Sequence, residues 1–252
     1  MSEAARRRTS LLPSFTLDQL YARARRTEEH LYRDIQKGDR AAKQAFSHIF
    51  LMYLAILDKC PEDEQALARL YRVATLFTCS HQRLEVIMNR VRAHYEVQLR
   101  INPNDSQACV RIYQIEVILN NASGAIPWAD KALRLNPENP DAHLAVAHEW
   151  LARGDRQAAR AATDRAIALN ANSADAYAFS ALLIGDEDIV RMIAEYRKCF
   201  DIDPSHLEAM TVLQRLSSEP KPAATHVKLN EVVAKLRRKL EFISGIGRRL
   251  RP

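Results

Sequence analysis

Apolar residues in this chain recur at intervals of three and four, the spacing that places side chains on one face of an α-helix. Between residues 141 and 169, two such faces follow one another. The inward positions are Ala142, Val146, Ala147 and Trp150, then Ala159, Ala166 and Leu169. Gly154 and Asp155 separate the two faces and are typical of a turn. The pattern predicts two helices, about 141–152 and 156–169, packed as a hairpin.

One eight-residue junction separates successive helix pairs and occurs four times. The copies begin at Ile101, Leu135, Leu169 and Ile202, which are 34, 34 and 33 residues apart. In three copies a proline follows two residues later, where it cannot continue a helix. An Asp, Asn or Ser then follows, and its side chain can cap the next helix by accepting a free backbone N–H. A fixed period of this size indicates a helical solenoid.

The composition agrees with this pattern. Apolar residues make up 47% of the 252 residues, which is enough to form a folded core. Only six glycines are present, mostly at predicted turns or near the C-terminus. The sequence therefore predicts an all-α fold, an α–α superhelix with short connections and a C-terminal amphipathic helix.

The units between residues 106 and 217 resemble tetratricopeptide repeats. The unit 140–173 shows the family's signature positions at Ala147, Gly154, Asp155, Ala159, Ala166 and Leu169. The unit 106–139 keeps Ala125, Ala132, Leu135 and Pro137, but departs from the pattern at Tyr113 and Glu116. The unit 174–204 keeps Ala176, Tyr177, Ala181 and Pro204, but has Met192 and Cys199 in place of the second-helix alanines. Residues 205–217 resemble the first helix of a fourth unit.

Upstream of residue 106 the pattern is stretched. Helices are expected at about 16–36, 40–59, 64–78 and 81–101, after a flexible N-terminus over residues 1–15. The second helix of each of these pairs is too long for a standard unit. We interpret residues 16–105 as two extended, degenerate helix pairs on the same solenoid. The alternative is a separate N-terminal helical module.

The C-terminal residues 218–252 carry the positive charge of the protein. Residues 221–252 hold nine Lys or Arg against two Glu, which gives +7 of a total of +6 and leaves −1 for the rest. A helix is expected from about 224 to 243, with an apolar stripe and a basic face. The basic residues are Lys228, Lys235, Arg237, Arg238, Lys239, Arg248, Arg249 and Arg251. Three roles fit this segment: a cap on the solenoid, an anchor on an anionic membrane surface, or a phosphate-contacting patch for nucleic acid.

No sequence pattern points to catalysis, a metal or a cofactor. His143 and His148 are five residues apart, whereas the zinc helix motif needs two histidines four apart. The four cysteines contain no Cys-x-x-Cys, which indicates free thiols and a reducing, cytoplasmic compartment. The longest apolar run, residues 49–57, is too short to span a membrane, and the N-terminus lacks an apolar signal core. We therefore expect a non-enzymatic protein without metal or cofactor.

In tetratricopeptide arrays the first helix of each pair lines a concave groove, so the resemblance implies a partner-binding face. Its residues here are Gln107, Val110, Gln114, Val117, Asp141, Leu144, His148, Leu151, Asp175, Ala178 and Leu182. Co-chaperones of the family hold a peptide carboxylate with Lys, Arg and Asn at these positions. This chain has Val110 and Gln114, then Leu144 and His148, so that clamp is missing. The remaining apolar strip suits an apolar helix or an extended segment. Alternatively, it packs against one of the protein's own terminal helices.

The resulting prediction is an adaptor, scaffold or chaperone that binds a protein segment in its groove during assembly of a larger complex. The basic tail would cap the array or contact a second, acidic partner. The alternative function is an accessory protein whose tail docks on nucleic acid or on an anionic membrane surface.

Overall fold

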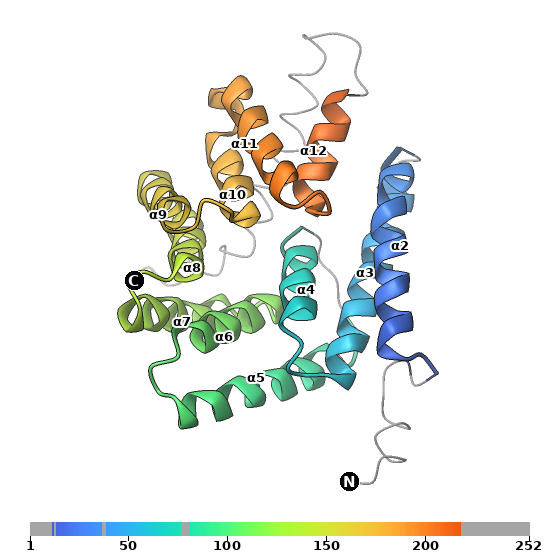
Figure 1. The fold of residues 1–252 in the computed structure, drawn as a ribbon, viewed down its shortest axis with the longest axis vertical. Coiled ribbons are helices and arrows are strands. Elements are labelled where there is room, and N and C mark those ends of the chain that lie inside the picture. The colour runs from blue at the N-terminus through green and yellow to red at the C-terminus, as the bar shows by residue number, and fades with distance from the viewer. Residues whose placement is uncertain (1–11, 13, 37–38, 77–80, 218–252) are drawn as a thin grey trace, which may run out of the picture.

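The computed structural model describes residues 12, 14–36, 39–76 and 81–217. All regular elements in this part of the chain are helical, which confirms the predicted all-α class (Figure 1). None of its helices is long and apolar enough to cross a bilayer. The basic residues of 218–252 and nearly all of the expected flexible N-terminus lie outside the described residues.

Three helix hairpins form the regular part of the solenoid. They are α6 (Ser106–Ile118) with α7 (Ala122–Leu135), α8 (Pro140–Ala152) with α9 (Arg156–Leu169), and α10 (Ala174–Ile184) with α11 (Ile189–Ile202). Each hairpin packs on the next through the contacts of α7 with α8 and of α9 with α10. The first helices begin 34 residues apart, at positions 106, 140 and 174. The sequence period is therefore the period of the structure.

The junction residues start these helices as the sequence predicts. The side chain of Asp105 accepts a hydrogen bond from the backbone N–H of Ala108 at 2.9 Å. Asn139 and Ser173 cap α8 and α10 in the same way. Each cap satisfies an N–H that the first turn of a helix leaves without an intrahelical partner.

The N-terminal helices depart from the expected arrangement of two hairpins. They are α2 (Leu17–Gln36), α3 (Asp39–Lys59), α4 (Glu64–Leu76) and α5 (Leu84–Ile101). Helices α2 and α3 pack along each other, but α4 packs on α3 and α6 rather than along α5. Helix α5 in turn contacts α6 and α3. Because Leu67, Leu70 and Val73 are completely buried, α4 is an integral part of the core.

The last helix, α12 (Leu207–Ser217), closes the solenoid back on its beginning. It contacts α11, α2 and α4, and Figure 1 shows it beside the N-terminal helices. Leu207 and Met210 belong to the same buried cluster as Leu20 and Leu67. Helix α4 thus lies inside a closed curve formed by the other helices, opposite the first helices of the hairpins.

Candidate partner-binding groove

A cavity of about 230 Å³ lies between α4 and the first helices of the three hairpins. Seven of the eleven groove residues predicted from the sequence line it: Val110, Gln114, Asp141, Leu144, His148, Asp175 and Ala178. Successive first helices contribute them because the 34-residue period repeats the same helix face. The expected groove positions therefore converge on one hollow.

The other four predicted residues have different surroundings. Gln107 bridges two helix starts, since its Nε2 donates to Asp141 Oδ2 at 2.9 Å and its Oε1 accepts from Asn139 at 3.2 Å. Val117 packs with Tyr113 and Ala145. The remaining two, Leu151 and Leu182, pack in the core between the second and third hairpins.

Helix α4 fills much of the space that an isolated array would leave open. Its Tyr71, Arg72 and Leu76 form one wall of the cavity. The Tyr71 ring lies edge-on to His148, with ring centroids 6.3 Å apart. His148 also lies against Phe179, with a centroid distance of 4.1 Å. Packing against one of the protein's own helices, which the sequence left open as an alternative, thus occurs along part of the groove.

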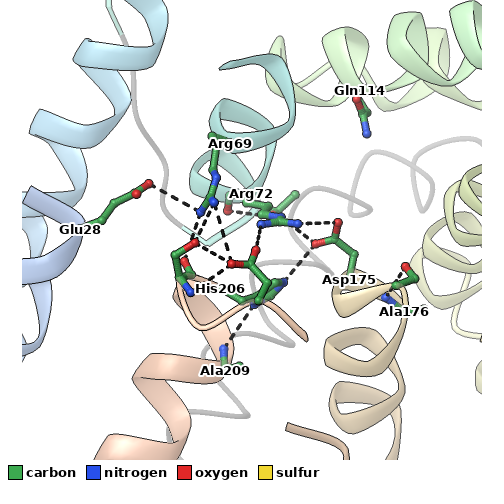
Figure 2. A network of polar contacts seen from close by, with 12 residues as sticks. Glu28, Arg69, Arg72, Gln114, Asp175, Ala176, His206 and Ala209 are labelled. Carbon is green, nitrogen blue, oxygen red and sulfur yellow. Dashed lines mark hydrogen bonds and ion pairs between the residues drawn. The ribbon is translucent and has the colours of Figure 1, made fainter. Parts of the chain in front are cut away.

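An ion-pair network joins α4 to the C-terminal helices at the edge of this cavity (Figure 2). Arg72 contacts Asp175 through Nε and Nη2, at 2.7 and 2.9 Å, and its Nη1 donates to Asp203 at 2.7 Å. His206 Nε2 lies 3.0 Å from the other side of Asp175. Burial opposes ionisation of Asp175, but Arg72 and His206 outweigh it and hold the pKa of Asp175 well below its usual range. Arg72 and Asp203 carry no signature of the repeat, so sequence reasoning missed them.

Two neighbouring residues of α8 have pKa values shifted in opposite directions. Burial lowers the pKa of His148 to about 4, although Asp175 acts against this shift. Burial raises the pKa of Glu149 to about 7, opposed by Arg153. At neutral pH the imidazole that faces the cavity is therefore uncharged.

The positive charges around the cavity are already neutralised. Arg72 faces two carboxylates, and Arg111 Nη2 lies 3.0 Å from Glu64. Arg111 also donates to Gln114 at 3.2 Å. With His148 neutral, the cavity favours an uncharged, largely apolar group over a carboxylate or phosphate.

The described residues contain no group of three or more His, Cys, Asp or Glu side chains arranged to hold a metal ion. His143 has a local role, since its Nε2 lies 2.8 Å from the carbonyl oxygen of Pro137. Cys109 and Cys199 are buried free thiols, and Cys60 is partly exposed. Their surroundings raise the pKa of all three, mainly through burial.

Comparison with known proteins gave matches only among solved structures. No family model and no curated protein matches the chain. TTC0263, a thermophilic TPR protein of Thermus thermophilus, is 19% identical with a TM-score of 0.44, over 75% of this chain and 99% of that one. MamA is 20% identical with a TM-score of 0.41, over 67% and 95%. YrrB, described as a TPR protein with an unusual peptide-binding site, is 16% identical with a TM-score of 0.39, over 79% and 98%.

These likenesses are distant, and the chain's own features are more informative. It repeats one junction every 33 or 34 residues, and each complete unit folds as a helix hairpin stacked on the next. An α-solenoid of this period is the architecture of tetratricopeptide repeats. The chain is therefore a tetratricopeptide-repeat protein, with a modified N-terminal part.

Proposed function

We propose that this protein is a non-enzymatic scaffold that binds an apolar segment of a partner protein in the cavity between α4 and the hairpins. The observation that carries the proposal is the lining of that cavity. Val110, Leu144 and Ala178 form its apolar walls, while Gln114 and Asp141 supply polar atoms at its edge. Such a mixture suits a peptide, whose side chains need apolar contact and whose backbone needs hydrogen bonds.

The size of the cavity limits what enters it. Sites that enclose a whole drug-sized ligand span about 300–1,000 Å³. The cavity here measures about 230 Å³ and fits one or two large side chains. We infer that a partner inserts an apolar anchor between α4 and the hairpins, and that the rest of its segment lies along the rim. Adaptor and chaperone roles in assembling a larger complex both fit this mode of binding.

The charge pattern sets the second requirement. Arg72 and Arg111 are both engaged with carboxylates, so recognition of a C-terminal carboxylate is not expected. A peptide with an amidated C-terminus should bind as tightly as the same peptide with a free carboxylate. Stronger binding of the free acid would contradict this assignment.

Selection of random peptides on the immobilised full chain tests the proposal. Enriched peptides are measured against wild type, Gln114→Arg, which places a bulky cation at the cavity, and Ala178→Phe, which fills it. Gln157→Arg makes the matched change on the exposed surface of α9. We expect both cavity variants to lose at least tenfold in affinity, equivalent to about 1.4 kcal/mol. Equal binding by all four folded proteins would refute the groove assignment.

The basic tail supports a separate candidate function. Its +7 charge would favour a docking role on nucleic acid, an anionic membrane surface or an acidic protein. Deleting residues 221–252 distinguishes the two functions: salt-sensitive binding to DNA or anionic vesicles depends on the tail, whereas binding of an uncharged groove peptide should survive. The free thiols fit a reducing compartment such as the cytoplasm.

A further inference from the structure

The two ends of the solenoid meet through a polar seam beside the groove. We call this seam the clasp, and it consists of Arg69, Arg72, Asp175, Asp203, Ser205 and His206. The two arginines come from α4, and their partners come from α10 and the junction between α11 and α12. The hydrogen-bonded pairs of the arginines are separated by 103 to 136 residues along the chain. The clasp therefore joins the beginning of the array to its end.

Both arginines are held at several points. Arg72 bridges two carboxylates, as described above. Arg69 Nη2 donates to Ser205 Oγ at 2.7 Å, and its Nη1 donates to the Ser205 backbone oxygen at 3.2 Å. Arg69 also lies 3.9 Å from both Asp203 and Glu28. Figure 2 shows the two guanidinium groups side by side, pointing from α4 toward the C-terminal helices.

The clasp lies between two cavities. Arg72 lines the groove cavity, and Arg69 lines a second cavity of about 330 Å³ together with Glu28, Tyr53 and Met210. Separation of α4 from the 203–208 segment would widen the groove at the same edge where Asp175 and His206 now narrow it. The clasp thus controls the width of the proposed partner site.

The helices on the far side of the clasp are able to move as one body. Helices α10, α11 and α12 share a buried cluster that includes Ala181, Met192, Tyr196 and Val212. Tyr196 also donates to Glu208 at 2.7 Å, which joins α11 to α12. The boundary between α9 and α10 is then the natural hinge, because α10–α12 have their own core beyond it.

The seam is more hydrated than the interfaces between hairpins. The Asp175 side chain is 47% exposed, and those of Arg72 and Asp203 are 19% and 21% exposed. Water can solvate these groups when the pair separates, and desolvation offsets much of the attraction while the pair is formed. The apolar part of the seam consists of Leu207 and Met210, which pack into the N-terminal core. Closure therefore depends on a few polar contacts and two apolar side chains.

We propose that the clasp gates the groove. In the closed state α4 and the 203–208 segment narrow the site, and opening swings α10–α12 away from α4 to admit the partner's apolar segment. Regulation of binding rests on the proposed function, but the opening itself does not. A substitution that weakens the clasp should raise the rate at which a groove peptide associates, since less closed protein has to open first.

The test uses the full chain with Arg69→Gln and Arg72→Gln combined. The control is Arg90→Gln, because Arg90 also pairs with a carboxylate, Asp58 at 2.6 Å, but does so within the N-terminal helices. Hydrogen exchange and small-angle X-ray scattering report opening without any partner. We expect amides of α4 and α12 to exchange at least about tenfold faster in the clasp variant, with α8 and α9 unchanged, and the radius of gyration to increase.

Three outcomes would overturn the proposal: unchanged exchange and scattering, uniformly faster exchange over all helices, or the same local effect in the Arg90→Gln control. If the double variant does not fold, Asp203→Asn provides a milder change that leaves Asp175 in place. With a peptide selected on wild type as probe, the folded clasp variant should associate several-fold faster. Local opening without faster association would overturn the gating role while leaving the groove assignment to its own test.

Discussion

The ring of Tyr71 lies edge-on to the imidazole of His148, which places α4 directly against the groove-lining face of α8. In an unmodified array, that face would be available to a partner. Here a helix from an earlier part of the same chain covers it and leaves a cavity instead of an open channel. The contact also removes water from His148, and this has a measurable consequence for stability.

We expect His148 to remain neutral down to a pH of about 4. Because the unfolded chain protonates this residue near pH 6.5, the folded state loses stability as the pH falls through the window between the two values. Between pH 7.5 and 5 the loss should be on the order of 1–2 kcal/mol. Urea unfolding of wild type and His148→Gln at both pH values measures it. An equal pH dependence in the two proteins would show that His148 does not titrate in this way.

The adjacent Glu149 should act in the opposite direction. Its pKa is raised to about 7, so the stability it contributes is fully present below the unfolded value of about 4.5 and is lost as the pH rises through 7. Glu149→Gln should therefore stabilise the protein at pH 8, by on the order of 1–2 kcal/mol, and have little effect at pH 4.5. Thermal unfolding at the two pH values checks this. A variant less stable than wild type at pH 8 would contradict the assignment.

Asn139 connects two consecutive hairpins, and its loss should be costly. Its Oδ1 accepts from the N–H groups of Asp141 and Ala142 at 2.9 and 3.2 Å, while its Nδ2 donates to Ser106 Oγ at 2.8 Å. Asn139→Ala removes the cap and a buried hydrogen bond, so we expect a loss of about 2–3 kcal/mol.

Ser173→Ala is the matched control for Asn139. Ser173 occupies the equivalent position 34 residues later, caps α10 with one bond of 3.3 Å, and has no side-chain bridge to the preceding hairpin in the described contacts. Its substitution should cost roughly 0.5–1 kcal/mol. Denaturant unfolding of both variants measures the difference, and equal losses would argue against the bridging role of Asn139.

Gly154 adopts a left-handed conformation in the turn between α8 and α9, with φ of 85°. A Cβ at this position would meet no atom within 4 Å, so substitution would affect only the backbone conformation. Gly154→Ala should lower the free energy of unfolding by about 1 kcal/mol. Asn120 occupies the equivalent turn position with φ of 58°, so Asn120→Gly should cause no loss. Chemical denaturation of the two variants checks the contrast, and a larger loss from Asn120→Gly would contradict it.

Several departures from the repeat pattern are explained by contacts with the N-terminal helices. Tyr113, at a position where the repeat favours a small residue, packs in the same cluster as Tyr71 of α4. Glu116, at an aromatic position, pairs with Arg92 of α5 and accepts from Asn121 at 2.7 Å. Both departures are visible in the sequence. Their partners are not, because contacts over this separation leave no local periodicity.

The sequence by itself determined the local structure: where helices begin and end, how hairpins repeat, and which face of each helix is apolar. Caps, prolines and glycines act within a few residues, so one chain segment contains the whole signal. Most of the predicted groove residues also converge, because the period carries their helix face from one unit to the next. The tertiary structure alone decided that α4 packs on α6 instead of along α5, and that Arg72 meets Asp175 and Asp203. An apolar face indicates that a helix is buried but not against which neighbour, and the closing ion pairs join residues more than a hundred positions apart.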